Sequence, residues 1–224
     1  MSYIIENLIL SNIENEIIQI EKELQKKGEI DNSNFIMNSI KKTLFKKKQL
    51  FFKLKRKFFI KNIIYSTQIN FFEAKKISTW IDQESNHMIN KTAKKIHEDA
   101  LENGCIVASY KKELIGFISL SKLKYSHPIY EIGSLVVHKK YQKLGIAKQL
   151  KEKLMNQHVN KLFFSITNVK TVQKINTELK LSKININIIP KKLLNIIQEE
   201  QKLLVNDIMF ANENFLNFIE EKHK

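Results

Sequence analysis

The chain has few of the residues that cross-link or punctuate a fold: its 224 residues include one cysteine, two prolines and five glycines. The single cysteine, Cys105, excludes an intramolecular disulfide framework and a multi-cysteine zinc site. No run of 18 uncharged apolar residues occurs, so we expect no ordinary transmembrane helix. The first residues lack a basic segment and a small-residue cleavage site, so we expect no signal peptide and a cytoplasmic protein. A hydrophobic fraction of 43% still suffices for a packed core.

Positive charge is abundant but unevenly distributed. The chain has 38 lysines and arginines against 23 acidic residues, which gives a net charge of +15. Residues 41–61 hold ten basic residues and no acidic one, so this short segment carries most of the net charge. Arg56 is the only arginine, which makes sequence-specific DNA recognition through guanine edges an unlikely role.

The first 60 residues have the periodicity of two helices. An apolar stripe at spacings of three and four is formed by Ile5, Ile9, Ile13, Ile17, Ile20 and Leu24. Turn-forming residues follow at 28–34, so residues 2–60 are predicted to form a helical hairpin with a basic second helix. Three interpretations stay open for residues 41–61: packed phenylalanines with solvated lysines, contact with an anionic membrane surface, or contact with nucleic-acid phosphates.

From residue 62 onward, short β-branched segments alternate with amphipathic helical segments. This alternation predicts a mixed α/β (α+β) domain with a central sheet flanked by helices. The expected strands are 62–68, 105–110, 114–123, 129–138, 161–167, 183–189 and 203–211. The expected helices are 71–85, 91–104, 145–157, 168–179 and one that begins after Pro190, with Gly104 ending the second.

The most informative segment is 131–154, in which a strand leads through a short loop into a helix. The loop contains Gln142, Gly145 and Ala147 in the pattern Gln-x-x-Gly-x-Ala. Backbone N–H groups at a helix start lack partners within the helix and can bind a pyrophosphate, and Gly145 permits a close backbone approach. This motif and the surrounding LVVHKKYQKLGIAKQL resemble the GCN5-related N-acetyltransferase (GNAT) superfamily. The resemblance covers about residues 62–211 and omits the first 60 residues.

The resemblance implies a GNAT-like central sheet that binds acetyl-CoA as co-substrate. Pantetheine would pair with the strand edge near 135–137, and the pyrophosphate would lie on the amides of 142–148. The implied cofactor-binding residues are Leu135, Val136, Val137, Gln142, Lys143, Leu144, Gly145, Ile146, Ala147, Lys148 and Asn168. For Asn168, a plain N-cap role is an equal alternative. The six histidines show no metal-ligand spacing, so we expect no metal.

Acetyl transfer to an amine needs a base for the amine proton and an acid for the leaving thiolate. The resemblance implies that Glu131 is the general base, and a structural carboxylate paired with a lysine is the alternative. Many family members carry a tyrosine in the helix after the fifth strand, but this chain has Ile175 and Asn176 there. The departure removes the usual acid, and Tyr141 is a weak substitute, as is Tyr130.

We therefore expect an N-acetyltransferase that transfers an acetyl group from acetyl-CoA to a primary amine of a small molecule, peptide or protein by direct attack. Residues 1–61 would form a helical extension and 62–224 the acetyltransferase domain. The alternative is a catalytically degenerate CoA-binding protein whose basic hairpin docks on a membrane, RNA or a protein partner. A homodimer formed through the hairpin is a further alternative.

Overall fold

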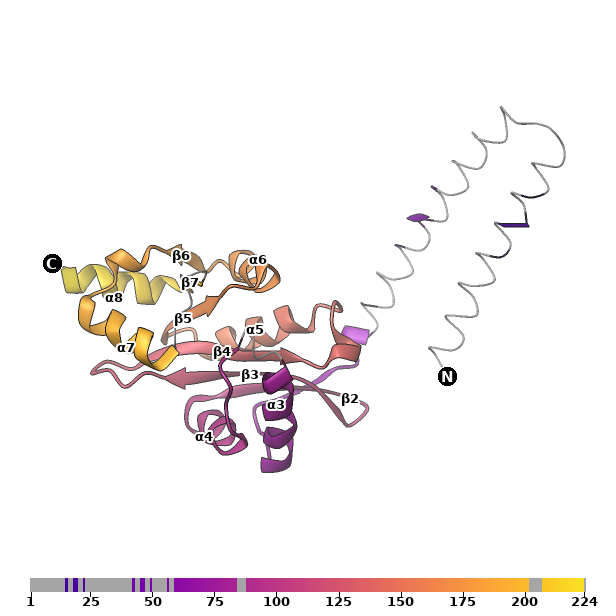
Figure 1. Cartoon of the computed structure of the whole chain (residues 1–224), viewed down its shortest axis with the longest axis horizontal. Coiled ribbons are helices and arrows are strands. Elements are labelled where there is room, and N and C mark those ends of the chain that lie inside the picture. The colour runs from indigo at the N-terminus through magenta and orange to yellow at the C-terminus, as the bar shows by residue number, and fades with distance from the viewer. Residues whose placement is uncertain are drawn as a thin grey trace. The chain divides into compact units, whose positions relative to one another are not determined.

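The computed structural model describes residues 59–83, 88–201 and 207–223, together with isolated positions between residues 15 and 56. The chain divides into two compact units, Met1–Phe58 and Phe59–Lys224. The predicted hairpin and most of the basic segment 41–61 lie outside the described residues, so their predictions stay untested. Figure 1 shows the second unit, which contains every helix and strand discussed below.

The second unit is built on a seven-stranded mixed sheet with the order β1-β2-β3-β4-β5-β7-β6. Neighbouring strands are antiparallel except β4 and β5, which are parallel. The strands are β1 (Ile64–Ser66), β2 (Cys105–Tyr110), β3 (Glu113–Lys122), β4 (Ile129–Val137), β5 (Leu162–Thr167), β6 (Ser182–Ile184) and β7 (Ile208–Ala211). The helices are α3 (Phe71–Gln83), α4 (Ala93–Asn103), α5 (Ile146–Gln157), α6 (Lys170–Glu178), α7 (Lys191–Gln201) and α8 (Glu213–His223). This arrangement confirms the predicted mixed α/β domain.

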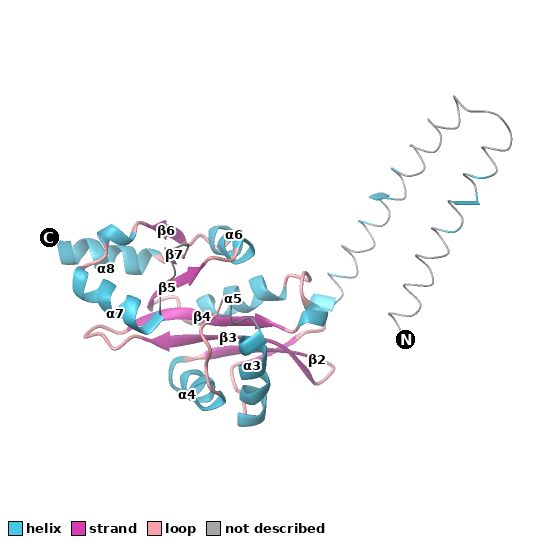
Figure 2. Ribbon diagram, in the orientation of Figure 1, coloured by secondary structure: helices cyan, strands magenta, loops and turns pink. Residues whose placement is uncertain are grey.

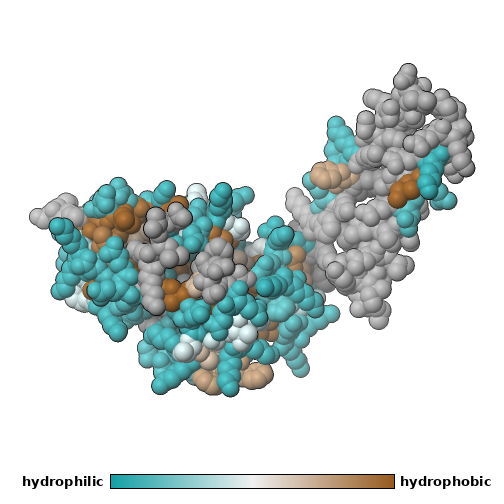
Figure 3. All heavy atoms as spheres, in the orientation of Figure 1, coloured by the Kyte–Doolittle hydropathy of each residue, from teal (hydrophilic) through white to brown (hydrophobic). Residues whose placement is uncertain are grey.

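Helices cover both faces of the central strands (Figure 2). Helices α3 and α4 bury Ile77, Ile81 and Ile96 against Phe117 on one face. Helix α5 lies on the opposite face, where its apolar stripe packs on Ile118 and its neighbours. A further cluster joins α7 and α8 to β4, β5 and β7. On the face that Figure 3 shows, hydrophilic residues cover most of the described surface.

Several predicted boundaries differ from the structure for local reasons. The predicted strand 183–189 is too long, because β6 ends at Ile184 and a 3-10 turn, Ile186–Ile188, follows. The side chain of Asn185 accepts a hydrogen bond from the backbone N–H of Asn187, which stabilises the turn in place of the strand. Helix α4 begins at Ala93 rather than residue 91, after an N-cap at Thr92, and it ends at Gly104 as predicted.

The two central parallel strands diverge after three residue pairs. The pairing of β4 with β5 covers Ile129–Glu131 on one strand and Leu162–Phe164 on the other. Beyond this point β5 pairs on its far side with β7, while β4 continues to Val137 beside β3. We call the region where the facing edges of β4 and β5 have no mutual pairing in the described structure the β4–β5 fork.

Candidate functional site

Among the residues that the structure describes, no strand pairs with the β5-facing edge of β4 over residues 132–137. Strand edges carry backbone N–H and C=O groups that can pair with an extended ligand. Ser134 has a positive φ of 53°, and the register with β3 shifts in the same region. This bulge turns the backbone locally, as bulges near binding sites often do. The predicted pantetheine positions Leu135, Val136 and Val137 therefore lie on an edge that is free of strand pairing.

Glu131 lies at the closed end of the fork, where the last β4–β5 pair forms with Phe164. Its side chain is 9% exposed, and burial raises the pKa of its carboxyl. The positive charges of Lys91 and Lys151 act in the opposite direction. A Cβ atom on Gly133 would lie 3.1 Å from the carboxyl atoms of Glu131, so the absence of a side chain at Gly133 gives the carboxylate its space.

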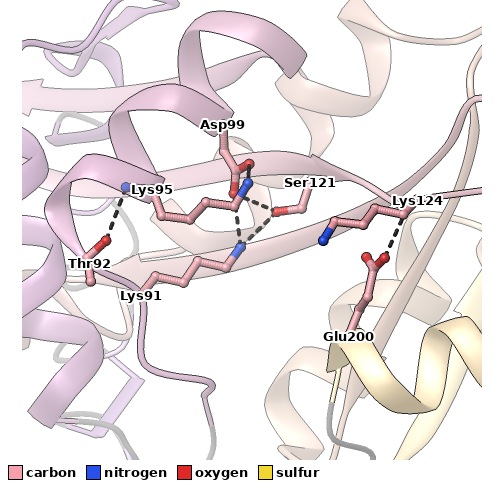
Figure 4. Close-up of polar contacts among 7 residues, drawn as sticks. All are labelled: Lys91, Thr92, Lys95, Asp99, Ser121, Lys124 and Glu200. Atoms are coloured by element: carbon pink, nitrogen blue, oxygen red, sulfur yellow. Dashed lines mark hydrogen bonds and ion pairs between the residues drawn. The ribbon is translucent and has the colours of Figure 1, made fainter.

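A polar cluster surrounds the same face of β3 and β4 (Figure 4). Lys91 Nζ donates to Ser121 Oγ over 2.7 Å, and Ser121 Oγ donates to Asp99 Oδ2 over 3.0 Å. Ser121 pairs directly with Glu131 across the two strands. Asp99 also forms ion pairs with Lys91 at 3.4 Å and with Lys95 at 2.9 Å. Charged groups are therefore concentrated on the Glu131 side of the sheet.

A second charged group approaches from α7. The carboxylate of Glu200 accepts a hydrogen bond from the backbone N–H of Lys124 over 3.1 Å. Figure 4 places Glu200 on α7 and Asp99 on α4, with Ser121 between them. The negative charges of Asp99 and Glu200 both add to the raised pKa of Glu131. The surroundings of Glu131 thus favour a carboxyl that can take up a proton.

The other end of β4 leads to the predicted anion-binding loop. Gly145 caps α5 with a φ of 88°, in the left-handed region, and Lys143 has a φ of 63°. Gln142 Nε2 donates to the backbone oxygen of Val137 over 3.1 Å, which ties the loop to the strand. Lys148 forms an ion pair with Glu178 at 2.7 Å. The first backbone N–H groups of α5 lack acceptors within the helix, which suits a phosphate group.

The structure does not bring Glu131 and Tyr141 together. Val137 lies six positions after Glu131 along β4, which corresponds to roughly 20 Å of extended strand. Tyr141 is buried near Phe59 and Tyr110, and its hydroxyl donates to Glu113 Oε2 over 2.6 Å. The suggestion that Tyr141 is the acid stays a prediction.

Asn168 follows β5 directly and precedes α6. The N-cap of α6 is Val169, so the alternative role of Asn168 as the N-cap is wrong, and the predicted helix start at residue 168 is two residues early. Its predicted contact with the cofactor stays a prediction. Among the other predicted cofactor-binding residues, Ile146 is the first residue of α5 and is buried in the core, so only its backbone can serve a ligand.

Comparison with known proteins agrees with this geometry. Residues 69–176 match the sequence model of the acetyltransferase (GNAT) family. This part of the chain is therefore similar to GNAT acetyltransferases. No curated protein matches the chain, which limits sequence comparison to the family level.

Solved structures support the GNAT fold. The chain is similar to an acetyltransferase of the GNAT family from Staphylococcus aureus, with 16% identity, a TM-score of 0.50, and coverage of 66% of this chain and 98% of that one. It is also similar to N-acetylglutamate synthase from Neisseria gonorrhoeae in complex with coenzyme A and N-acetyl-glutamate, with 12% identity and a TM-score of 0.53. That match covers 67% of this chain but only 34% of the synthase, so this chain corresponds to about a third of it.

Within the described ranges, no group of three or more His, Cys, Asp or Glu side chains could hold a metal ion. No helix in the part of the chain that the structure describes is long and apolar enough to cross a membrane.

The described structure also contains a buried cluster that sequence reasoning missed. Lys151 of α5 is 1% exposed and donates to Ser165 Oγ over 2.8 Å and to the side-chain oxygen of Asn176. Burial lowers the pKa of Lys151 to about 7, although the charge of Glu131 acts in the opposite direction. A signal existed in the sequence, because Lys151 falls on the helical stripe of Leu150 and Leu154.

Proposed function

We propose that the chain is an N-acetyltransferase that uses acetyl-CoA as co-substrate and a primary amine of a small molecule, peptide or protein as acceptor. The observation that carries the proposal is the β4–β5 fork, which has Glu131 at its closed end and the start of α5 beyond its open end. The similarity of residues 69–176 to GNAT acetyltransferases supports the same chemistry.

The residues along the fork fit the co-substrate. The backbone edge at Leu135, Val136 and Val137 offers N–H and C=O groups to the amides of pantetheine. The amides from Gln142 to Lys148 would bind the pyrophosphate, since they stand at the positive end of the α5 dipole. Lys143 and Lys148 add positive charge there, and Asn168 would contact the cofactor arm. Acetyl-CoA supplies the activated acetyl group, and the remaining chemistry falls to the side chains near the closed end.

Glu131 serves as the base for the acceptor amine. An amine attacks only in its unprotonated form, so a nearby carboxylate must take up a proton during the reaction. The raised pKa of Glu131 brings proton uptake closer to neutral pH than for an exposed carboxylate. The acceptor approaches from the side of Glu131 that carries Lys91, Asp99 and Glu200.

One observation favours a second candidate function. The positions where the family commonly has a tyrosine acid hold Ile175 and Asn176, and both side chains are buried. A chain without a group to protonate the leaving thiolate could bind CoA and turn over little. The second candidate is therefore a catalytically degenerate CoA-binding protein whose basic N-terminal segment docks on a partner or surface.

Binding and turnover separate the two candidates. Acetyl-CoA at a hundredfold excess over Kd should stabilise the folded chain by about 2.7 kcal/mol in a thermal-shift measurement. Thiol release across a panel of amines should then identify an acceptor. The absence of a thermal shift with acetyl-CoA would reject both candidates, and a shift without thiol release would select the CoA-binding protein.

Glu131→Gln tests the base directly. We expect thiol release to fall by 10²–10⁴-fold, the usual contribution of a general base, with CoA affinity kept. Glu98→Gln is the matched control, because Glu98 is a half-exposed carboxylate on α4 that forms an ion pair with Lys94 at 3.8 Å. Equal thiol release by Glu131→Gln and the wild type would remove Glu131 from the mechanism.

A further inference from the structure

Lys151, Ser165 and Asn176 bring three buried polar side chains together from three different elements. Lys151 comes from α5, Ser165 from β5 and Asn176 from α6, and their residues are at most 2% exposed. A lysine ammonium has donors only, so the side-chain oxygen of Asn176 must face it and the amide nitrogen must point elsewhere. The cluster therefore has a fixed orientation.

The cluster is incompletely hydrogen-bonded. The ammonium of Lys151 has three N–H donors, and Ser165 and Asn176 accept two of them. The amide nitrogen of Asn176 is buried and has no hydrogen-bond partner in the described structure. Leaving a buried donor unpaired is costly in free energy, so such groups need an explanation. A ligand atom that accepts hydrogen bonds would satisfy both residues at once.

The position of the cluster points to the identity of that ligand. Phe164 is the last β5 residue paired with β4, so Ser165 is the first β5 residue inside the fork. Glu131 and Phe164 are paired in parallel strands and project to one face, which puts Ser165 on the opposite face. Glu131 and Lys151 therefore approach the closed end of the fork from opposite faces of the sheet. Their charges are close enough for each to affect the other's pKa.

We propose that Lys151 is the acid of the acetyl transfer: it donates a proton to the sulfur of CoA as the acetyl group leaves, while the amide nitrogen of Asn176 contacts the same bound group. This inference rests on the proposed function, because the sulfur would have to lie at the closed end of the fork. The acid is then a buried lysine whose ammonium is held in place by two acceptors, Ser165 and Asn176.

The proton balance is complete with the residues present. The acceptor nitrogen forms a bond to the acetyl carbon, the carbon–sulfur bond breaks, and its electron pair leaves on sulfur. Glu131 gains the proton that the amine loses, and Lys151 loses the proton that sulfur gains. The products are an amide and a thiol, and exchange with water restores Glu131 and Lys151.

The acidity of Lys151 suits this role. Its pKa of about 7 lies below the value of about 8.5 typical of a thiol, so the transfer of a proton to a thiolate is favourable. An ordinary lysine with a pKa of about 10.4 would hold its proton more tightly than the thiolate. The burial that depresses the pKa of Lys151 therefore makes the residue a better acid.

The test follows acetyl transfer in a single turnover as a function of pH. Lys151 can donate a proton only while it is protonated, so the rate of the wild type should fall as the pH rises above about 7. In Lys151→Met this fall should be absent, and the rate below pH 7 should be lower by about 10²–10⁴-fold. Its affinity for desulfo-CoA should equal that of the wild type, because only the contact to sulfur is lost.

Lys153→Met is the matched control. It removes the same charge from the same helix, and the Lys153 ammonium lies 4.6 Å from the ring centroid of Tyr65, away from the cluster. We expect it to keep the rate and the pH profile of the wild type. If Lys151→Met binds desulfo-CoA normally and also keeps the rate and the pH profile of the wild type, the role of Lys151 is overturned. If neither CoA nor desulfo-CoA binds the wild type, the proposed function itself fails and the inference falls with it.

Discussion

Two buried ionisable residues, Glu131 and Lys151, have pKa values shifted in opposite directions by the same cause. Burial disfavours the charged form of each group, so it raises the pKa of Glu131 and lowers that of Lys151 to about 7. Their mutual attraction opposes both shifts but is the smaller effect. Burial of both residues therefore lowers the free energy of unfolding, and it places a proton donor and a proton acceptor at one point of the sheet.

The lowered pKa of Lys151 predicts how stability depends on pH. Below about pH 7 the folded and unfolded chains both carry the charged lysine, and the folded chain bears the full cost of burying it. Between about pH 7 and pH 10.4 the unfolded chain binds more protons at this site, so this residue's cost falls as pH rises. Lys151→Met removes the charge, and its stability relative to the wild type should therefore decline from about pH 6 to about pH 10.

Urea unfolding at about pH 6, 8 and 10 measures this trend. We expect the difference in free energy of unfolding between Lys151→Met and the wild type to change by about 1–4 kcal/mol from pH 6 to pH 10. The lost hydrogen bonds to Ser165 and Asn176 cost the same at each pH, so the trend isolates the charge. Lys153→Met, which removes a charge from a half-buried side chain outside the cluster, should show a much flatter trend. A relative stability of Lys151→Met that rises with pH would contradict the assigned shift.

At the scale of the elements, the β2–β3 turn carries a local conflict between sequence and conformation. Lys111 and Lys112 both have positive φ, 51° and 66°, which is the geometry of a type I′ hairpin turn. Such turns favour Asn-Gly, because a left-handed conformation costs a residue with a Cβ about 1–2 kcal/mol. Lys112→Gly should therefore raise the free energy of unfolding by about 1 kcal/mol. Lys122→Gly, in the extended backbone of β3, should lower it, and chemical denaturation measures both.

The elements also show what the sequence could and could not predict. Strand 129–138 and helix 145–157 were predicted to within a residue or so, because their apolar periodicity is local and Gly145 marks the helix start. The fork could not be predicted from periodicity, because it depends on β5 parting from β4 while its other edge pairs with β7, which comes much later in the chain. The burial of Lys151 was missed because a charged residue is normally assigned to a solvated helix face.

At the scale of the whole molecule, the division of the chain falls close to the basic segment. The second compact unit begins at Phe59, three residues before the start predicted for the acetyltransferase domain. Phe59 packs against Tyr110 and Tyr141, with ring centroids 4.4 and 5.6 Å apart. Aromatic pairs of this kind contribute about 0.5–1.5 kcal/mol beyond the area that they bury. Removal of the N-terminal extension should therefore preserve Phe59.

A chain that begins at Phe59 tests the role of the removed extension. Most of the ten basic residues of segment 41–61 are lost with it, and a basic residue near an anionic membrane is worth about 1 kcal/mol. We expect the full chain to bind vesicles that contain phosphatidylserine, with binding that weakens as salt is added, and the shortened chain to bind them poorly. Stabilisation by acetyl-CoA should be the same in both, because the fork and the α5 loop lie within Phe59–Lys224. Equal vesicle binding by the two chains would contradict a membrane-surface role for the extension. If the full chain binds RNA instead of vesicles, the basic residues of the extension contact nucleic-acid phosphates.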